Sequence, residues 1–187
     1  MSPTQFLVSF KSVWGGAVVA ATAGPLGLWA MDLEPPWPPS VGKVATLFCA
    51  VAVLLAYVVS RSFAPRSERA KTVRLIAITL LAVGLTAILA YLWAYSHYVV
   101  TDSIERSGRT EIIRMIVGST LRPGIEPGTA TQLDLLRDNL YDPEAVWTRQ
   151  SISTARMILL ISFVLSFFML TFGAALLAPL ENNAKPD

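Results

Sequence analysis

The sequence predicts an all-α polytopic membrane protein with four transmembrane helices and a small extramembrane α+β insertion between the third and the fourth. The first observation behind this prediction is a set of long stretches without any charged residue, and the second is that the charges gather between these stretches. Hydrophobic residues make up 53% of the chain and charged residues only 15%. A soluble domain usually has about a quarter charged residues. The composition therefore argues against an ordinary soluble domain.

The four apolar stretches have the length that a bilayer requires. A hydrocarbon core about 30 Å thick is crossed by a helix of roughly 20 apolar residues. The first stretch also resembles a signal peptide with a cleavage site at Ala21-Thr22-Ala23, but its apolar residues continue beyond that site. We therefore expect three transmembrane helices within residues 1–100, at about 12–31, 44–60 and 75–100, then an extramembrane domain at 101–155, a fourth transmembrane helix at 156–180 and a polar tail at 181–187.

Aromatic residues gather where these helices should leave the membrane. Tryptophan and tyrosine are enriched at membrane–water interfaces because their rings are amphipathic. The small extramembrane domain has too few apolar residues for a large core, so we expect it to rest on the membrane or on another subunit. The predicted interfacial anchors are Trp29, Trp37, Trp93, Tyr95, Tyr98 and, for the small domain, Trp147.

The distribution of basic residues predicts the orientation. The segment 61–74 contains five Arg or Lys residues and one Glu, and short loops of this kind are normally cytoplasmic. An even number of spans then places both termini in the cytoplasm and the small domain on the outer side of the plasma (inner) membrane. The inverse orientation remains an alternative, because the basic residues of the whole chain divide eight to seven between the two sides.

The extramembrane segment predicts a hairpin followed by helices. Residues 98–101 and 110–117 are rich in β-branched and apolar residues and flank a turn at 106–109. A helix over 109–117 is the alternative, because its apolar residues also fit helical spacing. A helix is expected over 129–140, with Leu133, Leu136 and Leu140 on one apolar stripe. Asp142-Pro143-Glu144 then provides a helix start with an N-cap, a first-turn proline and an acid.

Small residues recur at four-residue spacing within the predicted spans. Small faces allow helix backbones to approach closely in lipid. They predict either packing of the four helices on one another or self-association of the chain into an oligomer. The residues are Gly16, Ala20 and Gly24 in the first span, Ala52 and Ala56 in the second, and Ala82, Thr86, Ala90 and Ala94 in the third.

The sequence contains no recognisable catalytic, nucleotide-binding or metal-binding motif. One cysteine and one histidine are too few for a zinc site of the usual ligand types within one chain, and no cofactor is expected. Apart from Arg156 at the start of the fourth, no charged residue lies inside a predicted span, which argues against an ion-coupled transporter. The net charge of +2 does not indicate a nucleic-acid partner. An anionic ligand for Arg106, Arg109 and Arg114 is the remaining candidate contact.

These observations predict a non-enzymatic integral membrane protein. Its expected partners are the lipid bilayer and either further copies of the chain or another membrane or soluble protein, which it would dock through the extramembrane domain. The sharpest form of this hypothesis is a pore-forming or membrane-disrupting effector of the bacterial defence or cell-death type. The excess of Arg over Lys and the many Ala residues suggest a bacterial source. The alternative function is a small channel or transporter subunit.

Overall fold

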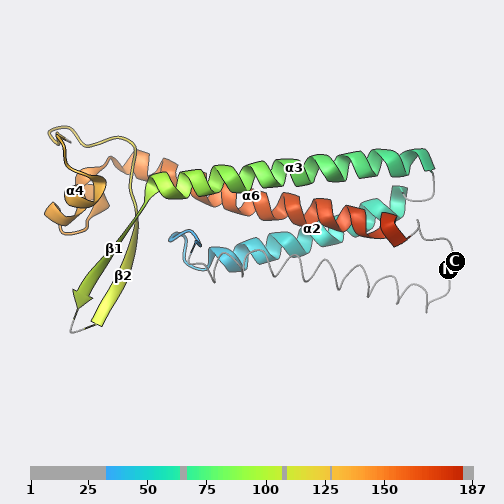
Figure 1. The fold of residues 1–187 in the computed structure, drawn as a ribbon, viewed down its shortest axis with the longest axis horizontal. Helices are drawn as coiled ribbons and strands as arrows, with labels where there is room; N and C mark the ends of the chain where they lie inside the picture. Colours follow the sequence, from blue (N-terminus) through green and yellow to red (C-terminus); the bar gives the residue numbers. More distant parts are fainter. Residues whose placement is uncertain (1–32, 64–66, 107–108, 127, 183–187) are drawn as a thin grey trace. The chain divides into compact units, whose positions relative to one another are not determined.

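The computed structural model of the chain describes residues 33–63, 67–106, 109–126 and 128–182. The described chain is mostly helical and contains one small two-stranded sheet (Figure 1). The first predicted span, 12–31, lies outside the described residues, as do Gly16, Ala20, Gly24 and Trp29. The polar tail is described only to residue 182.

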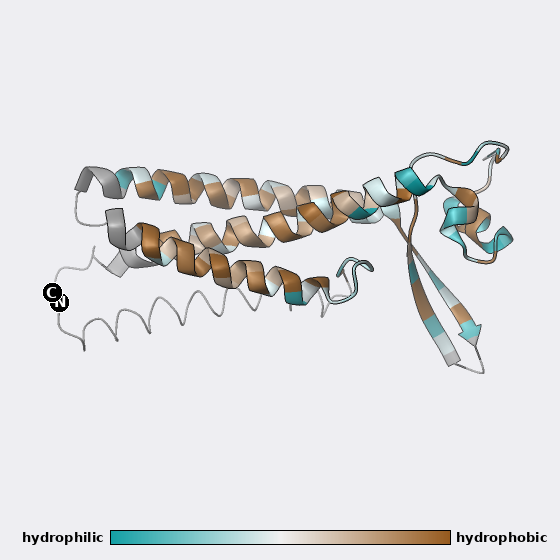
Figure 2. Cartoon of the chain, turned by 180° about the vertical axis from the view of Figure 1, so that it is seen from behind, coloured by the Kyte–Doolittle hydropathy of each residue, from teal (hydrophilic) through white to brown (hydrophobic). Residues whose placement is uncertain are grey.

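Three long helices are apolar enough to cross a membrane. They are α2 (Val41–Phe63), α3 (Ser67–Tyr98) and α6 (Arg149–Asn182). Their candidate membrane spans are Val41–Val59, Lys71–Tyr98 and Arg149–Leu177. Apolar residues cover most of their length (Figure 2). The predictions of apolar helices near 44–60, 75–100 and 156–180 are confirmed.

The helix boundaries differ from those predicted from the apolar runs. The basic segment 61–74 is not a long loop, because α2 continues to Phe63 and α3 begins at Ser67. Helix α6 begins at Arg149 rather than at 156. Residues 99–100 were assigned to the third span but form the start of a strand. A backbone hydrogen-bond ladder does not depend on hydrophobicity, so helices extend into polar sequence until a cap or a strand interrupts them.

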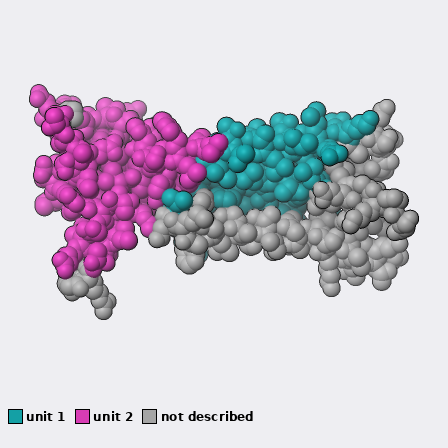
Figure 3. Space-filling view, viewed as in Figure 1, with its two compact units in different colours: residues 1–34, 40–88, 163–187 teal, residues 35–39, 89–162 magenta. Residues whose placement is uncertain are grey.

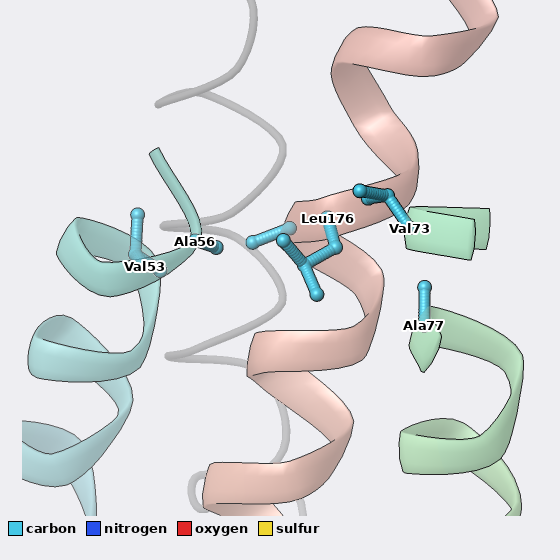
Figure 4. Packing of buried hydrophobic residues seen from close by; sticks show 6 residues of the cluster. Val53, Ala56, Val73, Ala77 and Leu176 are labelled. Carbon is cyan, nitrogen blue, oxygen red and sulfur yellow. The ribbon is translucent and has the colours of Figure 1, made fainter. Parts of the chain in front are cut away.

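The described residues divide into two compact units, shown in teal and magenta in Figure 3. Among the described residues the first takes in 33–34, 40–88 and 163–182, and thus all of α2 and parts of α3 and α6. In its core, Leu176 of α6 lies between side chains of α2 and α3 (Figure 4). The buried cluster consists of Val53, Ala56, Val73, Ala77, Ala175 and Leu176. Three of these six residues are alanines, and such small side chains allow helices to pack closely.

Close approach of α3 and α6 depends on Gly84. A Cβ atom at Gly84 would lie 2.8 Å from Cγ of Leu170 and 3.0 Å from the backbone nitrogen of Leu170. Gly173 marks a second close approach, since a Cβ atom there would lie 3.0 Å from the carbonyl oxygen of Ala77. The spacing pattern of small residues in the sequence did not single out these two glycines.

The second unit contains the predicted hairpin. Strands β1 (Val99–Arg106) and β2 (Arg109–Ile116) are antiparallel and eight residues long, with Cα partners running from Val99 opposite Ile116 to Arg106 opposite Arg109. The amide of Val117 donates to the carbonyl of Tyr98 at 2.9 Å and extends the ladder by one pair. The hairpin prediction is confirmed, and the alternative helix over 109–117 is wrong.

Two short helices follow the hairpin. Helix α4 (Gln132–Asp138) begins at a capping box in which Thr131 and Asp134 each bond the other's backbone amide. Helix α5 (Pro143–Val146) has Asp142 as its N-cap, and this confirms the predicted helix start. We call residues 99–148, which hold the hairpin, α4 and α5, the hairpin domain.

Helix α4 is shorter than the predicted helix over 129–140, and its apolar stripe is shorter too. Leu140 and Tyr141 have positive φ angles of 53° and 61°, so the chain leaves the helix before them. Leu136 is fully buried, whereas Leu140 is 90% exposed. The helix cap and the reversal of the chain at 140–141 override the periodicity of the leucines.

The hairpin domain has its own hydrophobic core. Trp147 lies within it at 3% exposure, and its segment forms an isolated bridge with Leu121. Backbone hydrogen bonds from Arg122 to Val146 and from Thr148 to Thr120 fix this bridge. The buried cluster consists of Met115, Val117, Leu136, Val146, Trp147 and Ile152. The prediction that Trp147 anchors the domain to the membrane or to another subunit is wrong, because its indole packs inside the domain.

Candidate functional site

The strongest polar interaction in the hairpin domain joins the hairpin to α4. The carboxylate of Asp102 accepts hydrogen bonds from Nε and Nη2 of Arg137, both at 2.9 Å. It also accepts one from the hydroxyl of Tyr141 at 2.9 Å and one from the amide of Ser103 at 2.8 Å. Asp102 is 8% exposed. The arrangement is a bidentate ion pair with a phenol and an amide completing it.

The electrostatics of this group follow from these four donors. Hydrogen bonds from the Arg137 guanidinium and the Tyr141 hydroxyl lower the pKa of Asp102 to about 2. The same contact with Asp102 raises the pKa of Arg137. Each carboxylate oxygen accepts two hydrogen bonds, so both are saturated by donors of the chain itself. This leaves no free acceptor on Asp102, and the ion pair holds β1 against α4.

Sequence reasoning missed this ion pair. Asp102 and Arg137 are 35 positions apart, and no spacing rule links them. The sequence did contain one signal of a buried charge. Asp102 lies on the same face of β1 as Val100 and is paired with the apolar Ile113 of β2. A charge on the buried face of a strand requires a partner, because an unpaired buried charge is costly.

The two faces of the hairpin differ. Val100, Ile113 and Met115 pack against the domain core on one face. Ile112 lies on the other face and is 61% exposed. The register places Ile112 opposite Ser103, in the half of the hairpin nearer the turn. An exposed isoleucine in an antiparallel ribbon is available to a further element.

The predicted anion-binding arginines stand at two different levels of the hairpin. The register places Arg106 directly opposite Arg109 at the end of the hairpin. Arg114 pairs with Thr101 instead, five positions along β2 from Arg109, which corresponds to about 17 Å at the rise of a strand. The side chains of Arg106 and Arg109 lie outside the described part of the structure. The anion contact of these three residues stays a prediction.

The predicted small-residue faces have different environments on α2 and α3. Ala52 and Ala56 of α2 and Ala94 of α3 are fully buried. Ala82, Thr86 and Ala90 of α3 are exposed. The Thr86 hydroxyl donates to the carbonyl of Ala82 at 3.0 Å, so it is satisfied within its own helix. Among the described helices, packing thus uses the α2 face, whereas Ala82, Thr86 and Ala90 of α3 stay exposed.

The aromatic residues at the end of α3 form a stacked group. The rings of Trp93 and His97 are nearly parallel, with centroids 5.4 Å apart, and the edge of His97 meets Tyr98 at 4.8 Å. Tyr95 contacts Tyr91 with centroids 5.9 Å apart. Trp93 is 64% exposed. An exposed aromatic group at the end of an apolar helix is typical of a membrane interface.

No protein-family model, curated protein or solved structure matches this chain. The class of protein therefore rests on the fold and on the site. The chain is mostly helical, has three described helices long and apolar enough to cross a membrane, and carries a small folded domain built on a two-stranded hairpin. Among the residues that the structure describes, no group of three or more His, Cys, Asp or Glu side chains is placed to hold a metal ion.

Proposed function

We propose that this chain is a non-enzymatic integral membrane protein that docks a partner through the edge of its hairpin, and that the partner is a second copy of the chain. In this proposal the chain crosses the plasma (inner) membrane four times, with residues 12–31 as the first span and both termini in the cytoplasm. The hairpin domain then faces the outer side. The basic residues of segment 61–74, where α2 ends and α3 begins, support this orientation.

The proposal rests on one observation: the sheet has only two strands among the described residues, so each strand has an edge without a neighbouring strand. The hairpin consists of two strands of eight residues, and the face bearing Val100 and Met115 packs on the domain core, whereas the other face has Ile116 buried at its base and Ile112 exposed. An isolated two-stranded hairpin is only marginally stable in water. A third strand would pair with backbone groups along an open edge and would cover Ile112.

The two edges of the hairpin are not equivalent. Because Val117 donates to Tyr98, alternation along the antiparallel ladder points the amides of Ser103, Thr110 and Ile112 away from the partner strand. The amide of Ser103 is already bonded to the Asp102 carboxylate. The edge of β1 is thus partly blocked, and β2 is the better docking edge.

The open face of α3 supports self-association within the membrane. Ala82, Thr86 and Ala90 form an exposed stripe of small residues on a helix that is able to cross a membrane. Helices in lipid associate through such faces because their backbones approach closely. A non-catalytic role is supported by Asp102, the buried carboxylate of the hairpin domain, which is saturated by its own ion pair and hydrogen bonds.

Replacing Ile112 with proline tests the docking edge. Ile112→Pro removes an outward-pointing amide and leaves the β1–β2 ladder its inward-pointing bonds. Thr101→Pro is the matched control, because the Thr101 amide points outward from β1. We expect cross-linking and mass measurement in detergent to show assemblies for the natural chain and for Thr101→Pro, but monomers for Ile112→Pro. A natural chain that stays monomeric, or an Ile112→Pro variant that assembles normally, would contradict the proposal.

A pore-forming effector is the sharper form of the same proposal. Four helices are too few to enclose a wide pore, so conduction would need several copies. Dye release from liposomes should then accompany assembly and be lost with Ile112→Pro. Assembly without dye release would reject the pore and leave docking intact. Side-specific labelling of a cysteine placed at Ala130, which is exposed, tests the orientation in a Cys49→Ala background.

A further inference from the structure

Arg156 of α6 stands at the start of an uncharged stretch. Residues 157–180 contain no Asp, Glu, Lys or Arg. From Arg156 to Leu177, the end of the candidate span, the helix rises by roughly 30 Å, which equals the thickness of a hydrocarbon core. A helix that spans the bilayer with this stretch therefore places the Arg156 guanidinium at the level of the lipid headgroups.

The surroundings of Arg156 differ from those of the other arginines on nearby helices. Arg137 pairs with Asp102 at 2.9 Å, and Arg149 pairs with Glu144 at 2.8 Å. Within the described part of the chain, Arg156 forms no salt bridge, and its Nε atom is buried without a hydrogen-bond partner. A buried donor of a charged group that lacks an acceptor is costly. The residues that the structure describes thus leave the Nε atom of Arg156 without an acceptor.

One contact orients the Arg156 side chain. The guanidinium carbon lies 5.4 Å from the ring centroid of Trp37, in the geometry of a cation–π interaction. Trp37 is 37% exposed and lies in the loop 35–39, whose other four residues are prolines. Proline restricts the backbone, so the indole is presented from a stiff loop. Stacking on the ring face leaves the Nη groups of a guanidinium able to donate to oxygen atoms.

We propose that Arg156 and Trp37 form a binding site for the phosphate group of an anionic phospholipid. The planar fork of a guanidinium matches phosphate oxygens. Tryptophan is favoured at the headgroup level, where such a phosphate lies. The lipid phosphate would supply the guanidinium with an acceptor that the described residues do not provide. This site is separate from the docking edge on β2 and does not depend on self-association.

Native mass spectrometry of the full-length protein in detergent tests the assignment. Phosphatidylglycerol and phosphatidylcholine are added separately, and bound lipid is counted for the natural chain and for Arg156→Gln. Arg149→Gln is the matched control, because Arg149 lies on the same helix and is 79% exposed. We expect Arg156→Gln to reduce bound phosphatidylglycerol by about fivefold or more. Arg149→Gln should leave it within about twofold, since its cation is already paired with Glu144.

Two further variants keep the test decisive if Arg156→Gln does not fold. Arg156→Lys preserves the charge but not the planar fork, and Trp37→Leu preserves the cation but not the ring. Both should bind less phosphatidylglycerol than the natural chain while their helix content, measured by circular dichroism, stays unchanged. Equal retention of phosphatidylglycerol in the natural chain and in the folded Arg156 and Trp37 variants would overturn the proposal. Displacement of the lipid by millimolar inorganic phosphate would assign the site to free phosphate instead and would overturn the lipid assignment.

Discussion

Two leucines, Leu136 within α4 and Leu140 just after it, allow a test of how the hairpin domain is held together. Leu136 and Leu140 lie one helical turn apart in the sequence, but Leu136 is fully buried and Leu140 is 90% exposed. Replacing a buried leucine with alanine costs about 2–5 kcal/mol through lost burial and the cavity left behind. At Leu140 only a tenth of the side chain is covered, so the loss is about 0.2–0.3 kcal/mol.

Hydrogen–deuterium exchange on the full-length protein in detergent measures this difference. The informative amides are those of Arg122 and Thr148, which join the two segments around Trp147 at 2.9 and 3.0 Å, together with the β1–β2 ladder. A loss of about 2–5 kcal/mol corresponds to a fall in protection of roughly 30-fold to several thousand-fold, limited by the stability of the domain itself. Leu140→Ala should leave protection nearly unchanged.

The comparison of the two variants tests whether the cluster around Trp147 is the core of the hairpin domain. If Leu136→Ala changes exchange at these amides by less than about threefold, the cluster around Trp147 is not the core of the domain. If Leu140→Ala causes an equal loss of protection, the claim that the chain reversal at 140–141 leaves Leu140 outside the core is wrong.

Two further predictions concern the ion pair and the helix packing. The pKa of Asp102 is about 2, below the value near 3.9 expected in the unfolded chain, so its contribution to stability is present above about pH 4 and is lost as the pH falls toward 2. Thermal unfolding followed by circular dichroism should show this loss in the natural chain and a smaller pH dependence in Asp102→Asn; equal pH profiles would refute the assignment. Gly84→Ala should weaken the packing of α3 on α6 by about 1–3 kcal/mol, because its Cβ would lie 2.8 Å from Leu170 Cγ. Leu85→Ala is the control, because Leu85 is exposed. Unfolding is followed in a strong detergent. If Leu85→Ala unfolded more readily than Gly84→Ala, that result would contradict the packing argument.

The elements that local sequence determines were predicted well. Uncharged stretches of about 20 residues identified α2, α3 and α6 because length and hydrophobicity are properties of the segment itself. The hairpin and the start of α5 at Asp142 were predicted for the same reason, since turn residues and caps act over a few positions. The ends of the long helices were not predicted correctly, because capping residues and strand pairing, rather than hydrophobicity, decide where a helix stops.

Contacts between residues far apart in the chain could not be predicted from the sequence. Asp102 meets Arg137 only because β1 lies against α4, and Arg156 meets Trp37 only because the loop 35–39 lies against α6. Trp147 looked like an interfacial anchor by its type, and only the bridge to Leu121 shows that it is a core residue.

The sequence by itself determined that this chain has helices suited to lipid and a small polar domain with a hairpin. The tertiary structure alone decided which leucine is buried, which of the described small residues of α3 are exposed and which carboxylate pairs with Arg137. The physical reason is that hydrophobicity and turn geometry are encoded within each segment, whereas burial and pairing depend on which segments the fold brings together.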